Sequence, residues 1–475
     1  MSVRARQATS PVAGERRDNT LKQYWARVLL IMAYFGALAF AFRHFMLVQY
    51  AEDMLEVQWV TTPDTDYPVL ISVGLAFAVA LVAASGTRRA RDVLLLLHAV
   101  VPVLPMLVIY AFRGAHTQYM VACVAMYFLV VLVAKTPFQT GLAHVSGYFR
   151  LSWVPLLVAM LAAIFVVGNI ATGGLKTFNF SFDDVYEFRR AAQDTRGVLL
   201  TYLSTNLVAF LIGFGCVVAF ARRNYLSLAV ILTLNLTIFG LTSHKSNFFA
   251  GLLAIAIYLV MRSRRPLNKL LLGAIMLCVA SVLIYWIDND LHLAGTYSVR
   301  RIMFVPAYIN FMYYDFFSQN PFVYWSDSKV SLGLIPRSYD VPATQVIANH
   351  FTGIDFSQRV ERYSNSNTGW LGAGYGHLGF AGMAIYALVI GMLIRTADVL
   401  ADKTSPAIAV ASLAYSYVIV LFCSADVPTA LLTHGVALSV IFAVLLIPLR
   451  HSATSARKKK IRSDGTAGSP ALSPG

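Results

Sequence analysis

Repeated apolar segments constrain the fold of this chain more than any other feature of its sequence. A helix needs about 20 consecutive, mostly apolar residues to cross the hydrocarbon core of a bilayer. The 475-residue sequence meets this requirement about twelve times, which predicts about twelve transmembrane helices. The predicted spans are residues 28–48, 67–84, 93–112, 118–134, 151–171, 198–221, 225–242, 247–261, 270–287, 369–394, 406–425 and 429–449.

The composition agrees with a membrane protein and argues against a soluble one. The chain is 58% hydrophobic and only 13% charged, which is roughly half the charged fraction of a soluble domain. Its net charge of +15 would suit a nucleic-acid-binding protein, but the basic residues lie in short clusters between apolar segments. That placement is typical of membrane-protein loops. We therefore predict an all-α, polytopic integral membrane protein that does not bind nucleic acid.

The distribution of charge predicts the orientation of the chain in the membrane. If both termini are cytoplasmic, most lysines and arginines lie on the cytoplasmic side and most acidic residues lie on the other side. The positive-inside rule describes this bias, and an even number of spans places both termini on the same side. The two basic tails, residues 1–27 and 450–475, are therefore expected in the cytoplasm.

Residues 288–368 form the longest stretch without a predicted span. A polar segment of this length is more than a connection between two helices needs. We expect it to form a large extracytoplasmic lobe between a membrane block of nine spans at 28–287 and three closing spans at 369–449. A shorter outward loop is predicted at 172–197. Binding or chemistry is expected on this side of the membrane.

Basic residues in the outward segments run against the charge bias and are therefore of interest. Arg189 and Arg190 lie in the shorter loop, and Arg300 and Arg301 lie near the start of the lobe. Arginine stays charged and presents a fork of N–H donors that fits phosphate oxygens. These residues predict a site for a diphosphate whose lipid tail stays in the bilayer. The alternative is that they pair with neighbouring carboxylates or with lipid headgroups.

Lys245 lies in a polar junction between two short apolar segments. Segments of about 15–18 residues are at the lower limit for crossing a membrane, so the junction is expected to dip below the surface. A lysine at that depth is costly unless it is paired or used. The alternative is a tight turn whose lysine reaches back to the interface.

A stretch rich in serine, asparagine and glycine leads from the lobe into the tenth predicted span. Its glycines allow a close approach of the backbone, either to a neighbouring helix or to a substrate. Polar side chains here and at the lysine junction could hydrogen-bond the hydroxyl groups of a sugar. The candidate glycan-binding residues are His244, Asn365, Asn367 and His377.

Candidates for a general base lie in the lobe. A base must reach the hydroxyl group that it deprotonates and must have a pKa near the working pH. The candidates are Glu361, Asp355, His350 and Asp340, and the alternative for each of them is a salt-bridge partner or a solvated residue. The sequence has no metal-ligand spacing, P-loop, dinucleotide-binding fingerprint or GxSxG motif. No metal and no cofactor are therefore predicted.

Three short motifs resemble those of the O-antigen polymerase (Wzy) family, the bacterial polymerases of oligosaccharide repeat units. About a dozen spans, cytoplasmic ends and two outward loops with arginines also resemble the family layout over most of the chain. The motifs are His244-Lys245-Ser246-Asn247 at the start of a short span, Arg300-Arg301 near the start of the long outward loop, and Asn367-Thr368-Gly369 with Gly379-Phe380-Ala381-Gly382 at the entry to the next span.

The resemblance implies a glycosyltransferase of the bacterial inner membrane that uses no nucleotide sugar. Such an enzyme moves a growing glycan from undecaprenyl diphosphate onto a new lipid-linked repeat unit, in the synthesis of O-antigen, capsule or exopolysaccharide. The resemblance implies Arg300, Arg301 and Lys245 as contacts of the departing diphosphate, with Arg189 and Arg190 as partners from the other loop. Implied partners are the undecaprenyl-diphosphate-linked oligosaccharide as donor and acceptor, the lipid bilayer, a chain-length regulator and a flippase.

Two other functions share the predicted layout. An O-antigen ligase has a similar architecture and also transfers glycan from undecaprenyl diphosphate. A transporter of the major facilitator type has about twelve spans with cytoplasmic termini. That fold places its long loop in the middle of the chain on the cytoplasmic side, whereas the corresponding loop here is only Arg222-Arg223-Asn224.

Overall fold

The computed structural model describes residues 13–50, 66–136, 147–180, 197–243, 245–353 and 365–448, without the side chains of residues 13–19 and 245–247. Every regular element within these ranges is a helix. The β-type pairing in the same ranges is a single isolated bridge between Phe149 and Leu446. The predicted all-α fold is therefore confirmed.

Nine helices in the described ranges are long and apolar enough to cross a membrane. Several contain a π-helical segment, at which the helix widens locally without ending. The label η marks both these π-helical segments and short 3₁₀ helices such as η4. The nine are α1–η1–α2 (Ala13–Ala41, Phe42–Met46, Leu47–Gln49), α4 (Tyr67–Ala84), α5–η2–α6 (Ala90–His98, Ala99–Val103, Leu104–Arg113), α7 (Thr117–Lys135), η4–α8 (Leu151–Trp153, Val154–Ala171), α10–η6–α11 (Val198–Asn206, Leu207–Leu211, Ile212–Ala221), α12 (Tyr225–Thr242), α14 (Pro266–Ile287) and α18 (Trp370–Lys403).

The other three predicted spans are also helical, but they are short or bent. Helix α13 (Lys245–Met261) has its apolar part at Phe248–Met261, and α19–η10 covers Pro406–Leu413 and Ala414–Leu421. Helices α20 (Val427–Thr433) and α21 (Val436–Leu445) meet at an angle of 54°. Gly435 breaks this last pair with a left-handed φ of 79°. The described residues therefore contain nine or ten full-length spans, and a count of twelve is not confirmed.

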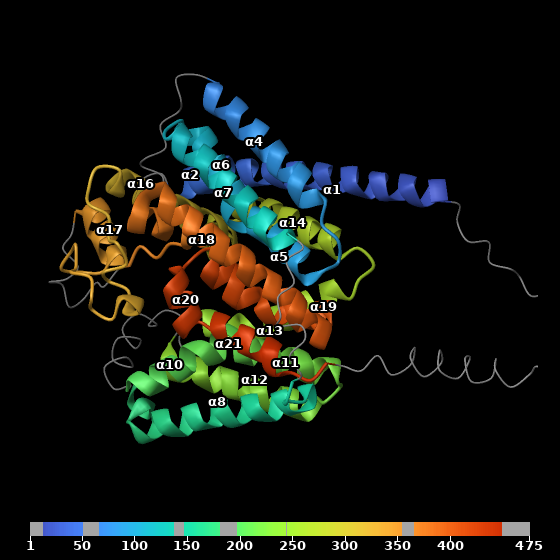
Figure 1. The fold of residues 1–475 in the computed structure, drawn as a ribbon, viewed down its shortest axis with the longest axis vertical. Helices are drawn as coiled ribbons and strands as arrows, with labels where there is room; N and C mark the ends of the chain where they lie inside the picture. Colours follow the sequence, from blue (N-terminus) through green and yellow to red (C-terminus); the bar gives the residue numbers. More distant parts are fainter. Residues whose placement is uncertain are drawn as a thin grey trace, which may run out of the picture.

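The helices pack as two groups with α18 and α19 between them (Figure 1). In the first group α1 packs against α4 and α14, and α4 packs against α6. In the second group α8 packs against α11 and α12, and α11 packs against α13. Helix α18 contacts α7 of the first group, and α19 contacts α11 and α13 of the second. The C-terminal helices thus join two groups that are built from earlier parts of the chain.

A polar contact lies at the centre of the bundle. Trp370 Nε1 donates a hydrogen bond of 3.0 Å to His98 Nε2. The His98 ring stacks on Phe422, with the ring centroids 4.5 Å apart. His98 and Trp370 have no exposed surface, so the hydrogen bond supplies a partner that water cannot supply there. This hydrogen bond joins α5 to the start of α18.

Helix α18 is broken near its start. Leu378 and Gly379 depart from helical backbone angles, and Gly379 has a left-handed φ of 59°. The chain turns so sharply there that a Cβ on Gly382 would lie 2.1 Å from the carbonyl oxygen of Gly374. The predicted span at 369–394 is therefore two pieces: a short helix at 370–377, which starts deep in the bundle at Trp370, and the long helix after the break.

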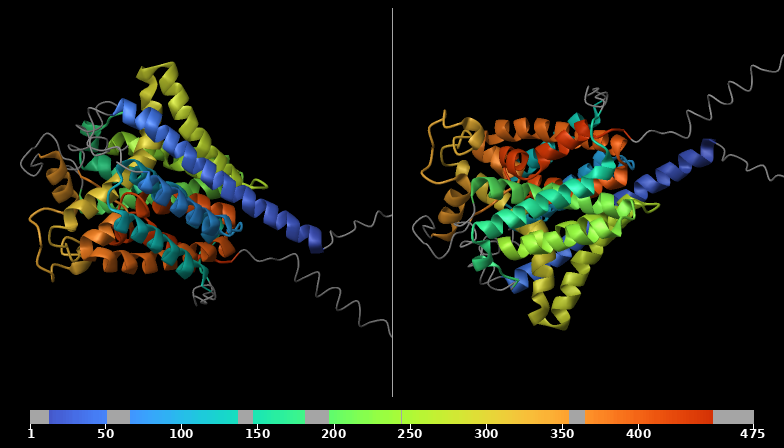
Figure 2. Two further views of the ribbon diagram at one scale, coloured as in Figure 1. Left: turned by 90° about the horizontal axis from the view of Figure 1, so that it is seen from above. Right: turned by 90° about the horizontal axis from the view of Figure 1, so that it is seen from below.

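The first part of the predicted lobe is helical and packs against the membrane helices. It contains η7 (Asn289–His292), α15 (Leu293–Gly295), η8 (Thr296–Phe304) and α16 (Val305–Phe317). The end of α14 and the helical segment after it project from the bundle as a hairpin (Figure 2), although α14 itself packs against α1. Helix α16 packs against α6 and α18. The short helices η9 (Lys329–Ser331) and α17 (Ala343–Thr352) follow.

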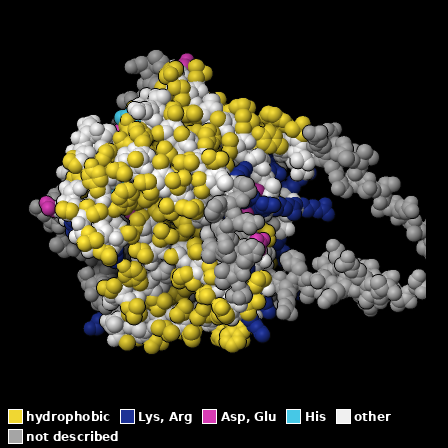
Figure 3. Space-filling model, viewed as in Figure 1, with side chains coloured by type: hydrophobic (Ala, Val, Ile, Leu, Met, Phe, Trp, Pro, Cys, Tyr) yellow, Lys and Arg dark blue, Asp and Glu magenta, His cyan; other side chains and the backbone are white. Residues whose placement is uncertain are grey.

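The lobe and the start of α1 lie at opposite ends of the molecule. Helices α16 and α17 are at the left of Figure 1, and α1 begins at the right. Between the two ends, hydrophobic side chains dominate the surface seen in Figure 3, and lysines and arginines gather at the right near the first turns of α1. Apolar side chains such as Leu70, Leu156 and Met276 are exposed along the helices, as expected for helices that face lipid. These features describe a multi-pass membrane protein.

We predict that alanine at Gly369 or Gly382 destabilises the protein, by about 1–3 kcal/mol, because a new methyl group would be forced against backbone that cannot move aside. A Cβ on Gly369 would lie 2.0 Å from the carbonyl oxygen of Phe422. Gly273, within α14, has nothing within 4 Å of the same position, so Gly273→Ala should leave stability unchanged or raise it slightly. Thermal unfolding of the three variants in detergent measures the difference. Equal midpoints for all three would contradict the packing described here.

Candidate functional site

The adjacent arginines Arg300 and Arg301 lie in different environments. Both belong to η8, where successive side chains point in different directions around the helix. Arg300 is 4% exposed, and its guanidinium carbon lies 4.7 Å from the centroid of the Tyr50 ring. The Tyr50 hydroxyl in turn hydrogen-bonds Thr296. Arg301 is exposed. The structure therefore holds Arg300 by a cation–π contact and leaves its neighbour at the surface.

A third arginine on the lobe side forms a buried ion pair. Arg113 ends α6, and its Nη2 lies 2.6 Å from the carboxylate of Asp315 on α16. His116 Nε2 contacts the other oxygen of the same carboxylate. The Arg113 and Asp315 side chains are 7% and 13% exposed, and a buried ion pair is strongly destabilised when one partner is removed. This pair ties the lobe helix α16 to the membrane helix α6.

Aromatic side chains continue from this ion pair to α18. The His116 ring packs edge-on against Tyr314, and Tyr314 stacks on Tyr119 with centroids 4.5 Å apart. Tyr375 of α18 packs against both tyrosines. Such rings can stack on sugars, but Tyr119 and Tyr375 are buried by their protein neighbours. Their observed contacts connect three helices.

His377 lies at the centre of a second polar network. The backbone N–H of Trp325 donates to His377 Nδ1 at 3.1 Å. Nδ1 is therefore an acceptor, so Nε2 carries the proton and donates to Asp426 Oδ2 at 3.1 Å. The Trp325 ring stacks on the His377 ring with centroids 5.0 Å apart. His377 was predicted to bind glycan, but both of its nitrogens are bonded to the protein.

Asp426 accepts three hydrogen bonds, two from side chains of α18 and one from the backbone of α20. Its Oδ1 accepts from the Tyr386 hydroxyl at 2.6 Å and from the backbone N–H of Val427 at 2.8 Å, which caps α20. The Tyr386 hydroxyl also accepts from Trp325 Nε1 at 2.7 Å. The Asp426 side chain is still 21% exposed. The network therefore joins the lobe, α18 and α20 around one carboxylate at the surface of the bundle.

Two carboxylates of this region help to raise the pKa of Tyr313 on α16. Burial raises the pKa of Tyr313, and the negative charges of Asp327 and Asp426 raise it further. Asp327 itself accepts a hydrogen bond of 3.0 Å from the backbone N–H of Ala343, at the start of α17. Asp327 and Asp426 thus lie within electrostatic range of the same phenol, which stays protonated at any physiological pH.

The glycine-rich entry to α18 is packed against protein. The backbone N–H of Gly372 donates to Asn310 Oδ1 at 2.6 Å, and Thr368 Oγ1 donates to the same oxygen at 3.1 Å. A Cβ on Gly372 would lie 2.9 Å from that oxygen. Of the two interpretations of these glycines, close packing between protein segments is the one observed at Gly369, Gly372 and Gly382.

The remaining predicted residues lie apart from these networks or outside the described residues. Asn365 and Asn367 are exposed at the edge of the lobe, and Asn365 Oδ1 accepts from Thr344 Oγ1 at 3.1 Å. His350 is exposed on α17 with its ring against Phe316. Residues outside the described ranges are Arg189, Arg190, His244, Asp355 and Glu361, and the Lys245 side chain is outside them as well. Their assignment stays a prediction.

Sequence analysis missed Arg113, Asp315 and Asp426 as members of a site. Arg113 is the last residue of the third span, and Asp426 lies in the connection between the last two predicted spans. A charged residue at the outward end of a span is a signal that could have identified both. Their partners could not be identified from the sequence, because each pair joins helices that are far apart along the chain. Within the described ranges, no cluster of three or more His, Cys, Asp or Glu could hold a metal ion.

Comparisons of the chain with protein-family models, with curated proteins and with solved structures find no match. The resemblance to the O-antigen polymerases therefore rests on the short motifs and on the arrangement of the spans.

We predict that Asp426→Asn destabilises the protein by about 1–3 kcal/mol, the cost of a buried donor left without an acceptor. If the amide oxygen accepts from Tyr386 and Val427, the NH₂ group faces the Nε2–H of His377, and two donors then oppose each other. Thermal unfolding in detergent measures the loss. Asp340→Asn is the control, because Asp340 is exposed on the same lobe and its substitution should change stability by less than about 0.5 kcal/mol. Equal effects of the two variants would contradict the role assigned to Asp426.

Proposed function

We propose that this protein is a glycosyltransferase that polymerises undecaprenyl-diphosphate-linked oligosaccharide repeat units on the extracytoplasmic side of the bacterial inner membrane. The observation that carries the proposal is the burial of Arg300 in η8, at the junction between α14 and the lobe. A permanently charged group within a membrane bundle is costly, and it marks a functional position by default. The motifs shared with the O-antigen polymerases point to the same residue.

Arg300 is suited to hold a diphosphate. A guanidinium that lies over an aromatic ring uses its face, whereas its N–H donors project from its edge. Tyr50 therefore fixes the orientation of the Arg300 head group over its ring and so lowers the entropy lost when the group binds an anion. Apolar side chains are exposed at the end of α14 and in the segment that follows it, among them Trp286, Ile287 and Tyr297. This surface supports the approach of a substrate whose lipid tail remains in the bilayer.

The proposed reaction transfers a glycan between two lipid-linked molecules. A hydroxyl group of the acceptor sugar attacks the anomeric carbon of the donor glycan, and the bond from that carbon to the diphosphate oxygen breaks. The diphosphate leaves with the bonding electron pair, and its developing charge needs a preorganised cation, which we assign to Arg300. The proton of the attacking hydroxyl passes to a general base, for which Glu361, Asp355 and His350 are the candidates. The diphosphate leaving group already activates the donor, so no nucleotide is required.

The lobe provides the polar surface for the sugars. Asn365 and Asn367 are exposed at its edge, close in sequence to the segment that enters α18. The networks around Asp315 and Asp426 fasten the lobe to α6, α18 and α20. A lobe fixed in this way keeps its sugar-binding side chains at a constant distance from the membrane, which transfer between two membrane-anchored substrates requires.

We predict that Arg300→Ala abolishes chain extension, with a loss of about 100-fold or more in polymerisation, as is typical when a group that stabilises developing charge is removed. Arg300→Lys keeps the charge but not the fork of donors, so its activity should stay well below wild type. Arg337→Ala is the matched control, because Arg337 is exposed on the lobe. The assay is the length distribution of the surface glycan in a deletion strain that expresses each variant.

The amount of each variant in the membrane is measured by immunoblot in the same cells. Glycan of normal length from Arg300→Ala would remove Arg300 from the site. The deletion strain itself separates the polymerase from the related ligase. Loss of a polymerase leaves a single repeat unit attached to lipid A, whereas loss of a ligase leaves none.

A further inference from the structure

A cavity of about 350 Å³ lies at the end of the molecule opposite the lobe. Three segments line it: residues 20–27 of α1, the connection between α4 and α5, and residues 264–268 at the start of α14. These segments are far apart in the sequence and belong to none of the networks at the lobe end. The cavity therefore requires a separate explanation.

Arginine dominates the charge of this cavity. Arg27, Arg88, Arg264 and Arg265 line it, and no aspartate or glutamate does. Arg88, Arg264 and Arg265 are exposed, and in the described part of the chain none of them forms a salt bridge. Like charges that share a small volume repel one another, so a bound anion would stabilise this arrangement.

One of the arginines is held in place by the protein. Arg27 Nη1 donates a hydrogen bond of 3.0 Å to the carbonyl oxygen of Ala84, and it also bonds the carbonyl oxygen of Gly86. Arg27 is thereby fixed between α1 and the α4–α5 connection. A preorganised guanidinium loses less entropy on binding an anion than a mobile one does.

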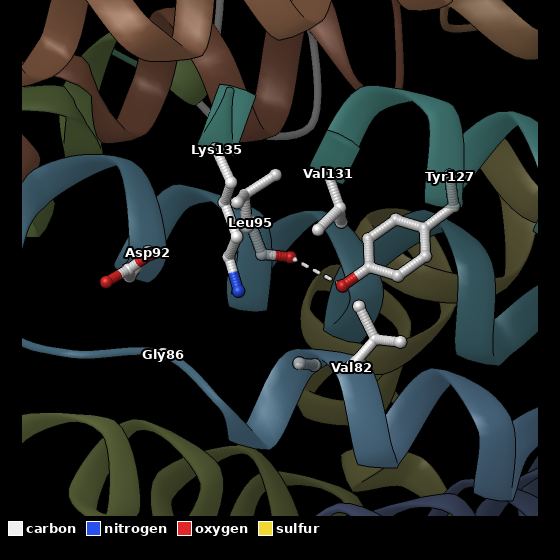
Figure 4. Close-up of a pocket in the computed structure, with 8 residues that line it drawn as sticks. Val82, Gly86, Asp92, Leu95, Tyr127, Val131 and Lys135 are labelled. Atoms are coloured by element: carbon white, nitrogen blue, oxygen red, sulfur yellow. Dashed lines mark hydrogen bonds between the residues drawn. The ribbon is translucent and has the colours of Figure 1, made fainter. Parts of the chain in front are cut away.

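The α4–α5 connection is itself held by two side chains that are not among those lining the cavity. Asp92 accepts hydrogen bonds from the backbone N–H of Thr87, at 2.7 Å, and from its hydroxyl group. Lys135 Nζ donates to Ser85 Oγ at 2.8 Å. Figure 4 shows Asp92 and Lys135 on the same side of the backbone at Gly86. The nearby carboxylate is thus bonded to the connection and is not among the groups that line the cavity.

Apolar surface begins beside the cavity. Leu21, Trp25 and Leu29 of α1 are exposed, as are Leu272 and Met276 of α14. The two helices pack against each other, and tryptophan is enriched where a membrane helix meets the interface. A ligand of this site therefore has an anionic head that fits the arginines and an apolar part that can lie along α1 and α14.

We propose that the cavity binds the phosphodiester headgroup of an anionic phospholipid of the cytoplasmic leaflet. Basic pockets between the cytoplasmic ends of membrane helices bind such headgroups, and the volume is within the range of small-molecule sites. Four arginines favour a lipid with two phosphates, such as diphosphatidylglycerol. Bound there, the lipid would hold α1, α4 and α14 together at this end of the bundle. The site is independent of the transferase proposed at the lobe end.

The test uses the full-length protein in detergent, with binding of diphosphatidylglycerol measured by native mass spectrometry and by thermal shift. Arg264→Gln/Arg265→Gln should weaken binding by about tenfold or more, since each basic residue near an anionic lipid adds to its affinity. Arg222→Gln/Arg223→Gln makes the same change of charge in exposed residues between α11 and α12, outside the cavity. This control should bind like the wild type. Higher salt should weaken wild-type binding.

Each of these binding measurements has an outcome that would overturn the proposal. Equal loss of binding in both double variants would show only a general attraction to positive charge, and unchanged binding in Arg264→Gln/Arg265→Gln would remove the site. Zwitterionic phosphatidylcholine should not give the thermal shift, and the same shift with it would overturn the requirement for an anionic headgroup. Inorganic phosphate at equal concentration should not displace the lipid. Displacement would identify a site for free anions and overturn the assignment to a lipid.

Discussion

The need to satisfy every backbone polar group away from water governs this structure. In lipid only a helix satisfies its own backbone, so a chain with these apolar segments must be helical throughout its membrane part. Breaks in a helix are tolerated where other protein groups take over the hydrogen bonds. Asn310 accepts from the N–H of Gly372 at the entry to α18, and Asp426 accepts from the N–H of Val427 at the start of α20. Irregular backbone therefore occurs where protein surrounds it.

At the lobe end one acidic side chain both caps a helix and bonds other side chains, and a second joins the lobe to a membrane helix. Asp426 caps α20 and at the same time bonds His377 and Tyr386. Asp315 joins α16 to Arg113 at the end of α6. The lobe is consequently part of the bundle rather than a separate domain, and a substrate bound to its edge would lie at a fixed position relative to Arg300. The transfer reaction that we propose at the membrane surface depends on this coupling.

The two ends of the molecule use arginine in different ways. Arg113 and Arg300 at the lobe end are buried and are oriented by Asp315 and Tyr50. At the other end exposed arginines converge on a cavity, and only Arg27 is bonded to backbone carbonyl groups. A buried, oriented cation suits the stabilisation of charge in a reaction, whereas an open basic cavity suits a lipid headgroup. The two sites that we propose therefore differ in how their arginines are held.

The sequence alone determined the fold class and the positions of the helical segments, because the apolar length that a span needs is a local property. It also located Arg300, Arg301 and the glycine-rich entry to α18, whose composition is unusual for a membrane helix. Only the tertiary structure decided that Arg300 is buried over Tyr50 while Arg301 is exposed, that His377 is bonded to Asp426, and that α18 and the last span are broken. These outcomes depend on which helices pack together. Packing between helices is set by contacts across the whole bundle, which no local pattern of residues contains.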